Sequence, residues 1–200
     1  MSALLTQDRF FVSQKAKFIE LTNEYKIRDE AGNELGHVTE ENQSVLKKVV
    51  RFIGNLDTMM THTYGLYDAT DAKIVETIRP RALIFSKVHI KDSSGREVGT
   101  LVQGKKIFKK FEFSIVGPGG EKLGMVRAEN WRAWDFQLLD ASEKQVGRIT
   151  KKWAGGVKEI FTTADNYMVE IDPSVTGDLR LLMLAVATGI DTAIKQDDKN

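Results

Sequence analysis

An apolar stretch near the C-terminal end, LRLLMLAVATGIDTAI, constrains the fold of this chain more than any other feature. It runs from Leu179 to Ile194, and no residue between Arg180 and Asp191 carries a charge. Apolar side chains fall on every face of a helix built from it, which indicates a helix surrounded on all sides. The uncharged part spans about 15 Å, roughly half of a bilayer's hydrocarbon thickness. We therefore expect a helix over about 178–195 that fills the centre of a soluble fold.

A repeated pattern supplies the wall around that helix. Alternating apolar residues lead into an Asp or small-residue turn, followed by an aliphatic residue, Gly, any residue and another aliphatic residue. The copies are YKIRDEAGNELGHV from Tyr25, the degraded YGLYDATDAKIVET from Tyr64, VHIKDSSGREVGTL from Val88, FSIVGPGGEKLGMV from Phe113 and FQLLDASEKQVGRI from Phe136. Each is typical of a β-hairpin, because the alternation gives one buried face and the turn residues tolerate positive φ.

Five hairpins predict ten strands, and further strands near 10–14 and 167–171 raise the total to about twelve. An open sheet of that size would expose its edges, whereas a closed barrel has none. The predicted fold is mainly β: a twelve-stranded closed antiparallel β-barrel that encloses the C-terminal hydrophobic helix, in one domain over residues 1–200. One segment departs from the repeat. Residues 43–54 place apolar side chains at helical spacing and predict a short outer helix.

Four copies of the repeat carry a glycine in the second strand, at Gly36, Gly99, Gly124 and Gly147. These glycines share strand parity with inward apolar residues, so one interpretation is that they thin the wall where the helix lies close. The other interpretation is that they mark β-bulges. The sequence leaves both open.

Composition narrows the class of function. The chain has no cysteine, and its 29 Lys and Arg against 28 Asp and Glu give a net charge of +1. Disulfides, thiol catalysis and cysteine lipidation are excluded, and no global charge attracts nucleic acid. The first fifteen residues lack a signal-peptide pattern, so we expect a cytoplasmic protein. His37, His62 and His89 belong to no metal or catalytic motif and are interpreted as strand residues, so no enzymatic activity is expected.

Two basic clusters are the candidate binding residues. The first comprises Lys105, Lys106, Lys109 and Lys110, and the second comprises Arg148, Lys151 and Lys152. Each basic residue that lies near an anionic leaflet contributes about 1 kcal/mol to the free energy of binding. The alternative interpretation is that they serve solubility and edge protection. We expect the clusters to adjoin and to bind anionic phospholipid headgroups.

The C-terminal quarter resembles a known family. Residues 147–193, GRITKKWAGGVKEIFTTADNYMVEIDPSVTGDLRLLMLAVATGIDTA, are similar to the C-terminal part of the phospholipid scramblase family, with Trp153, Phe161 and Ala164-Asp165-Asn166-Tyr167 among the matching residues. Earlier motifs, such as Tyr25-Lys26-Ile27, extend the resemblance to roughly residues 17–194. It implies a tubby-like fold shared with plant LURP-one-related proteins. It also implies a tie to phospholipid movement across bilayers, and to anionic lipids or partner proteins, often with calcium.

The resemblance places the family's calcium-associated loop at residues 163–174. Among the six expected ligand positions only Asp165 is a carboxylate, and the others are Thr163, Tyr167, Val169, Ile171 and Ser174. Alternation favours reading Tyr167, Val169 and Ile171 as one face of the last strand. We therefore expect no calcium site, with Asp165 a remnant of one, and no other cofactor.

The predicted function is a tubby-like barrel that binds anionic phospholipid surfaces or a protein partner and is linked to phospholipid scrambling. We expect a cytoplasmic monomer, peripheral at the inner face of the plasma membrane. The alternatives are a soluble protein-interaction module without lipid transport and a barrel that binds a small ligand beside its helix. Nucleic-acid binding through the lysines and tryptophans is a further, less favoured alternative.

Overall fold

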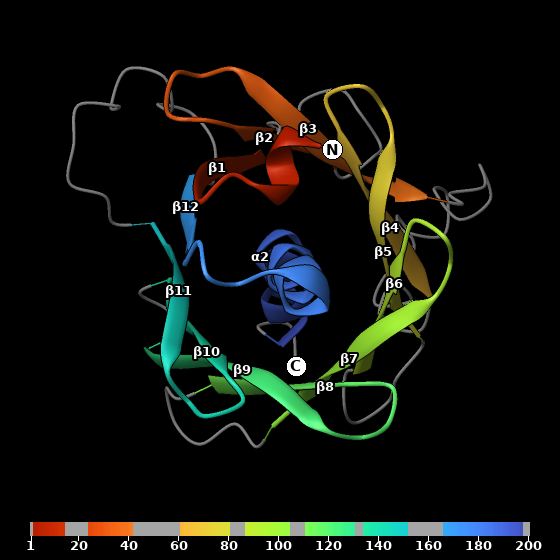
Figure 1. The fold of residues 1–200 in the computed structure, drawn as a ribbon, viewed down its shortest axis with the longest axis vertical. Helices are drawn as coiled ribbons and strands as arrows, with labels where there is room; N and C mark the ends of the chain where they lie inside the picture. The colour runs from red at the N-terminus through yellow and green to blue at the C-terminus, as the bar shows by residue number, and fades with distance from the viewer. Residues whose placement is uncertain are drawn as a thin grey trace.

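The computed structural model describes residues 2–14, 24–41, 61–80, 87–104, 111–130, 134–151 and 166–197, with side chains at all of these except 14, 24, 129, 130 and 190–197. Across these residues the chain forms a closed antiparallel barrel with one helix inside it (Figure 1). The predicted twelve strands and their closure are confirmed.

The strands follow one another around the barrel in chain order, and β1 pairs with β12 to close it. Their bounds are β1 Arg9–Gln14, β2 Glu24–Arg28, β3 Glu34–Glu41, β4 His62–Asp68, β5 Lys73–Arg79, β6 Lys87–Asp92, β7 Glu97–Gln103, β8 Phe111–Val116, β9 Lys122–Asn130, β10 Asp135–Asp140, β11 Gln145–Thr150 and β12 Asn166–Ile171. Alternation puts one face of each strand inside, as the burial of Phe111, Phe113 and Ile115 on β8 shows.

The five tight turns share a local design that explains the Asp in the repeat. In four of them the carboxylate of the Asp accepts a hydrogen bond from a main-chain N–H two to four residues later; these are Asp29, Asp68, Asp92 and Asp140. Each of the five turns also contains one residue with positive φ, and these are Gly32, Asp71, Gly95, Gly120 and Glu143. Side-chain caps and left-handed residues reverse the chain in four or five residues.

All five hairpins contain a β-bulge just after the turn. Two consecutive residues of the second strand then face inward, as Leu35 and Gly36 do opposite Ile27 of β2. The extra residues in the five hairpins are Leu35, Ile74, Val98, Leu123 and Val146. The bulge interpretation of the repeat glycines is therefore correct.

The other interpretation of the glycines holds at one position. A Cβ on Gly99 would lie 3.0 Å from Cδ2 of Leu182 on the central helix. At all four glycines the nearest atom would be a main-chain oxygen of the neighbouring strand, and at Gly36, Gly124 and Gly147 no helix atom is among the three nearest. Only Gly99 thins the wall against the helix, whereas the other three glycines permit the bulge.

The central helix, α2, runs from Gly177 to Asp197 and confirms the helix predicted over 178–195. Residues 182–187 are each at most 1% exposed, so the wall surrounds them completely. Among the described residues, no helix combines the length and apolar character that a membrane crossing requires. The outer helix predicted over 43–54 lies outside the described residues.

Helix α2 contacts the wall on more than one side. Its main contacts are with β5, β6, β7 and β12. Large side chains on other strands, such as Phe113 on β8 and Phe136 on β10, fill the rest of the interior and are at most 3% exposed.

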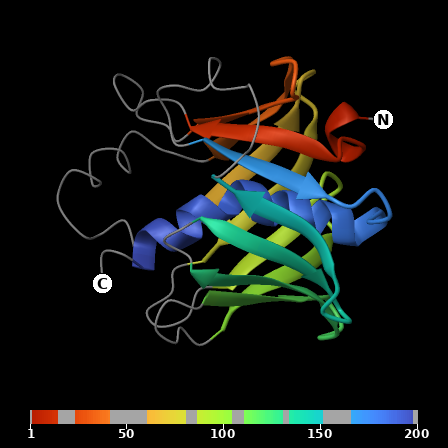
Figure 2. The same cartoon turned by 90° about the vertical axis from the view of Figure 1, so that its left-hand side faces the viewer.

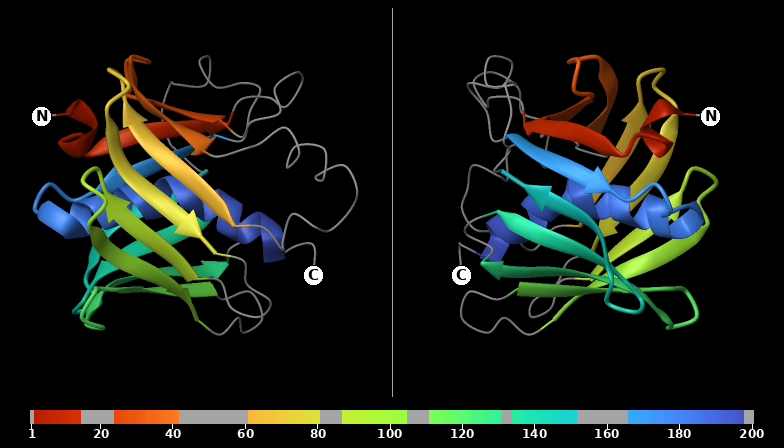
Figure 3. Two further views of the ribbon diagram at one scale, coloured as in Figure 1. Left: turned by 90° about the vertical axis from the view of Figure 1, so that its right-hand side faces the viewer. Right: turned by 60° about the vertical axis from the view of Figure 1, so that its left-hand side comes forward.

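The two ends of the barrel differ. At one end, named here the hairpin end, tight turns at 29–33, 69–72, 93–96, 117–121 and 141–144 connect the strands, and residues 172–176 lead into α2. The other end, named the loop end, is joined by six connections at 15–23, 42–61, 80–86, 104–110, 131–134 and 151–165. Helix α2 begins at the hairpin end and runs toward the loop end (Figures 2 and 3).

The start of α2 is fixed to the hairpin end. Asp178 in the first turn accepts two hydrogen bonds of 2.8 Å from Arg96 in the β6–β7 turn. The short 3-10 helix η1, Ala3–Leu5, lies at the same end and buries Leu4 completely in the core. The chain's first described residues therefore cover the mouth of the barrel where the helix enters.

Candidate functional site

The loop end contains the residues predicted to bind headgroups. Arg148 on β11 and Lys151 just after it are described, while Lys105, Lys106, Lys109, Lys110 and Lys152 lie outside the described residues. The main-chain N–H of Gly104, the residue before the first lysine cluster, donates a 2.8 Å hydrogen bond to the carbonyl oxygen of Glu112 on β8. The first cluster belongs to the β7–β8 connection, and the second comprises Arg148 on β11 and two lysines of the β11–β12 connection, at the same end of the barrel. Their adjacency stays a prediction.

Arg148 is already paired. Its guanidinium faces outward and donates two hydrogen bonds to the carboxylate of Asp135 on β10, at 2.8 and 2.6 Å. These hydrogen bonds raise the pKa of Arg148 above its ordinary value. A lipid phosphate would have to compete with Asp135 for this cation, so Arg148 is a weaker candidate than the sequence suggested.

Lys151 lies against an aromatic ring. Its Nζ is 4.2 Å from the centroid of the Trp134 indole, a cation–π contact, and its main-chain N–H donates to the carbonyl oxygen of Trp134 at 3.1 Å. The main-chain bond continues the β10–β11 ladder by one step beyond the Asp135–Thr150 pair. The last main-chain hydrogen bond of this ladder thus positions a cation and an indole together at the loop end.

Trp134 rests on two inward-facing rings. It packs edge-on against Phe136, with centroids 5.9 Å apart, and tilted against Tyr167, with centroids 5.8 Å apart. Phe136 and Tyr167 are almost fully buried, whereas Trp134 is only partly buried. Trp134 therefore lies at the rim of the barrel, while Trp131 and Trp153 lie outside the described residues.

A charged cluster inside the wall was not predicted. Glu40, His62 and Arg79 face inward at the loop-end termini of β3, β4 and β5 and are 7%, 4% and 7% exposed. The His62 Nδ1 lies 2.6 Å from Oε1 of Glu40, and His62 is paired with Arg79 across the β4–β5 ladder. Alternation from Val38 and Tyr64 would have placed Glu40 and His62 inside.

The outer face of the same three strands has a second polar cluster. Glu41 accepts hydrogen bonds from the Tyr67 hydroxyl and from Lys73, which also bonds Glu76. Burial acts to lower the pKa of Lys73, but the two carboxylates outweigh it and raise the pKa to about 12. Gly65 leaves the space for this cluster, since a Cβ there would overlap Glu41 and the Tyr67 ring. This cluster joins three strands from outside.

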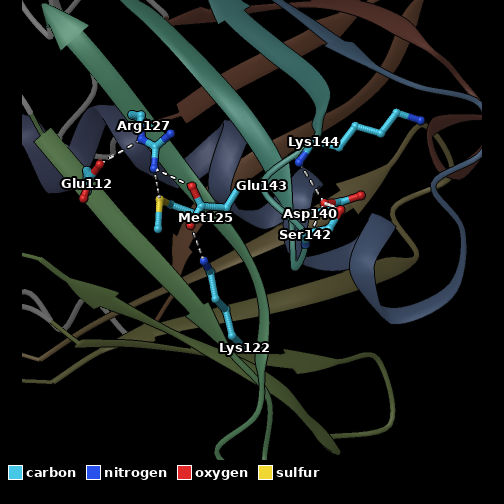
Figure 4. Close-up of polar contacts among 8 residues, drawn as sticks. All are labelled: Glu112, Lys122, Met125, Arg127, Asp140, Ser142, Glu143 and Lys144. Carbon is cyan, nitrogen blue, oxygen red and sulfur yellow. Dashed lines mark hydrogen bonds and ion pairs between the residues drawn. The ribbon is translucent and has the colours of Figure 1, made fainter.

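Ion pairs also cover the outer wall of β8 and β9 and the β10–β11 turn. Arg127 donates hydrogen bonds to Glu112 at 2.8 Å and to Glu143 at 3.0 Å, and Lys122 donates to Glu143 at 2.9 Å. Figure 4 shows how these side chains lie. The hydrogen bond with Glu143 is the main cause that raises the pKa of Arg127 above its usual value. Cations on this wall are matched by carboxylates, so the wall is a poorer surface for anionic headgroups than the loop end.

The segment aligned with the calcium-associated loop forms β12 and the turn after it. Tyr167, Val169 and Ile171 face the core and are at most 2% exposed, which confirms the strand interpretation. The carboxylate of Asp172 accepts hydrogen bonds from the main-chain N–H and hydroxyl of Ser174. Asp165 lies outside the described residues, and the expected lack of a calcium site stays a prediction.

Comparison with known proteins gives a consistent family. Residues 1–194 match the Scramblase family. The chain is 23% identical to Altered inheritance rate of mitochondria protein 25 of Saccharomyces cerevisiae, over 95% of this chain and 71% of that protein. It is 21% identical to a phospholipid scramblase family protein of Schizosaccharomyces pombe, over 83% of this chain and 46% of that protein. Identity with Phospholipid scramblase 1 of Mus musculus is 36% over 58 residues, 28% of this chain and 18% of that protein.

A solved structure supports the architecture. A protein from Arabidopsis thaliana aligns with a TM-score of 0.56 and 13% identity, over 93% of this chain and 91% of that one. At this identity the likeness concerns the fold alone, and it agrees with the predicted tubby-like barrel.

Proposed function

Because the chain belongs to the Scramblase family, as its resemblance predicted, we propose that it binds anionic phospholipid surfaces through the loop end of its barrel. Relatives named as phospholipid scramblases support a lipid-related role. The chain spans less than half of those two relatives, so the proposal concerns binding by the barrel itself.

The observation that carries the proposal is a difference in charge between the two ends. The six loop-end connections contain fourteen Lys and Arg and four Asp and Glu, a net charge of +10. The six hairpin-end connections contain two Lys and Arg and six Asp and Glu, a net charge of −4. A chain whose overall charge is only +1 is thus strongly polarised along the barrel axis.

This polarity sets an orientation. Each basic residue close to an anionic leaflet contributes about 1 kcal/mol, and the attraction decays over about 8 Å at physiological salt. The basic end is therefore drawn to the membrane while the acidic end is repelled from it. The proposed location is cytoplasmic, at the inner face of the plasma membrane, because anionic lipids enrich that leaflet.

Binding is proposed in preference to lipid transport by the barrel alone. A headgroup crossing a bilayer needs a polar path, because unpaired polar groups are costly in hydrocarbon. Helix α2 fills the barrel and buries residues 182–187 against the wall. It completes the core of its own domain, so leaving the barrel to line such a path would expose that core.

Vesicle co-sedimentation tests the proposal. The protein is expected to sediment with phosphatidylcholine vesicles that contain phosphatidylserine, to bind pure phosphatidylcholine weakly, and to dissociate as salt rises. Lys105→Glu/Lys106→Glu/Lys109→Glu/Lys110→Glu should abolish binding. Lys122→Glu/Lys144→Glu at the hairpin end is the control and should bind as the parent does. Binding that ignores both salt and the loop-end variant would contradict the proposal and favour a protein-interaction module.

A lipid-scrambling assay on the same vesicles separates binding from transport. Fluorescent lipid is placed in one leaflet and its accessibility to an external reductant is followed with and without calcium. The expected result is binding without scrambling. Calcium-independent scrambling by the purified chain would show that the barrel transports lipid and that binding is only part of its function.

The buried cluster of Glu40, His62 and Arg79 favours a second candidate function, a barrel that takes a small polar ligand beside α2. Charged groups on an inner wall are able to recognise a charged ligand. Calorimetry with soluble glycerophosphoserine tests it. Heat of binding that disappears in Arg79→Met would support this candidate, and no heat at millimolar ligand would argue against it.

A further inference from the structure

Trp134 has an unusual backbone for its residue type. Its φ is +50°, in the left-handed region that bulky residues rarely adopt. Such strain persists only where the surroundings hold the residue firmly, and it collects at functional sites and ligand clamps. The position precedes β10, where Gly or Asn would adopt the same conformation at lower cost. The backbone conformation therefore does not by itself explain why a tryptophan occupies this position.

The surroundings of Trp134 hold the ring in one orientation. Tyr167 and Phe136 support it from the core side, and the Lys151 ammonium lies 4.2 Å from the ring centroid. The Lys151 N–H also holds the strained residue's carbonyl oxygen at 3.1 Å. A partly exposed indole is thus fixed beside a cation at the end of the barrel where the connections carry a net charge of +10.

A purely structural role explains only part of this arrangement. Filling the mouth of the core requires an apolar ring but neither a cation beside it nor a partly exposed position. An indole with one polar edge and an adjacent lysine is the combination that membrane proteins place at headgroup depth. There the ring packs among glycerol and carbonyl groups while the ammonium pairs with lipid phosphate.

We infer that Trp134 and Lys151 form a membrane-interface anchor: the indole enters the headgroup layer and the Lys151 ammonium binds phosphate oxygens of anionic phospholipids. This inference rests on the proposed function and names two residues that would carry it. Base stacking by single-stranded nucleic acid is the less favoured occupant, because Lys151 covers one side of the ring and Tyr167 packs against it from the core. Insertion into a lipid headgroup layer does not require an uncovered face of the ring, as base stacking does.

Fluorescence of Trp134 alone tests the anchor. In Trp131→Phe/Trp153→Phe, Trp134 is the only tryptophan. Its emission is expected to shift to the blue with phosphatidylserine-containing vesicles and to be quenched by a nitroxide on the lipid headgroup. Neutral vesicles should cause neither change. If this variant does not fold, the parent protein compared with Trp134→Phe gives the same signal by difference.

Variants at Lys151 test the cation. Lys151→Met keeps the main-chain bond to Trp134 and the apolar stem, and it is expected to weaken vesicle binding about fivefold, the effect of one lysine near an anionic surface. Lys144→Met, an exposed lysine at the hairpin end, is the matched control and should bind unchanged. Equal effects of the two variants would contradict a specific role for Lys151.

The outcomes separate this inference from the proposed function. Salt-sensitive sedimentation together with an unquenched Trp134 would overturn the anchor and leave headgroup binding at the loop end intact. Failure to sediment with anionic vesicles at all would overturn both. Quenching of Trp134 by a single-stranded oligonucleotide, without any response to vesicles, would show that the site binds nucleic acid.

Discussion

The guanidinium of Arg180, in the first turns of α2, donates a 2.7 Å hydrogen bond to the carbonyl oxygen of Gln7. The same side chain lies 3.2 Å from Oδ1 of Asp8 and 3.3 Å from the carbonyl oxygen of Val175. Arg180 is 6% exposed, so these contacts are made away from bulk water. The central helix and the first segment of the chain therefore hold each other in place at the hairpin end.

Arg180→Met should destabilise the protein by about 2 kcal/mol, because hydrogen bonds to a charged, buried group are worth about 1.5–3 kcal/mol. Arg9→Met is the matched control. Its guanidinium also joins two carboxylates, Glu30 and Glu170, but is 50% exposed, so about 1 kcal/mol or less is expected. Urea unfolding measures both. A loss for Arg180→Met no larger than for Arg9→Met would show that the contact with Gln7 does not stabilise the fold.

Gly99→Ala should destabilise the barrel by about 1–3 kcal/mol, the usual range for overpacking. The added Cβ would lie 2.8 Å from the carbonyl oxygen of Val116 and 3.0 Å from Leu182, so both wall and helix must shift. Gly189→Ala is the contrasting variant, since no described atom lies within 4 Å of its Cβ and alanine favours helix. It should stabilise by about 0.5–1 kcal/mol. Thermal unfolding that ranks the two variants in the opposite order would contradict this packing.

The repeat and the apolar helix were sufficient to predict the barrel, because both are local patterns that a single strand or helix expresses by itself. An inward position such as Tyr25 or Phe113 follows from alternation alone. The sequence could not show which glycine meets the helix. Gly36, Gly124 and Gly147 occupy the same place in the repeat as Gly99, but a Cβ on Gly99 alone among these four would meet a helix side chain, that of Leu182.

The candidate site was less predictable, because its contacts join residues from different strands. Arg148 appears as a free cation in sequence, yet Asp135, thirteen residues earlier, neutralises it. Glu40 and His62 are separated by the 42–61 connection, so their contact depends on the register of β3 against β4. The left-handed φ of Trp134 has no sequence signal, since Gly or Asn is the usual residue there.

Acid should weaken the fold through the turn aspartates. A hydrogen bond from the Thr70 hydroxyl lowers the pKa of Asp68, and one from the Ser94 hydroxyl lowers the pKa of Asp92. Their folded pKa values lie below the unfolded ones, so the stabilisation is complete above about pH 4 and is lost as the pH falls through the folded values. Urea unfolding from pH 2 to pH 6 should show this loss.

Asp68→Asn/Asp92→Asn isolates those two carboxylates. Asparagine keeps an oxygen that accepts the turn N–H groups but does not titrate, so the variant should fold at neutral pH and lose less stability in acid than the parent. Thr70→Val/Ser94→Ala, which removes the hydroxyl donors, should reduce the acid loss in the same direction. An acid loss identical in all three proteins would show that these turns do not set the pH dependence.

The buried pair of Glu40 and His62 should be strongly coupled. Their contact of 2.6 Å is enclosed by the wall, with side chains 5% and 4% exposed. Removing one partner leaves the other polar group buried without that hydrogen bond. The destabilisations by the two single variants should therefore add up to more than the destabilisation by the double variant. A double-mutant cycle with Glu40→Gln and His62→Gln should give a coupling energy of about 2 kcal/mol.

The pair of Glu97 and His89, at 3.1 Å but 42% and 37% exposed, provides the comparison and should couple by less than about 1 kcal/mol. Equal coupling in the two cycles would mean that enclosure inside the barrel adds nothing to the interaction between Glu40 and His62.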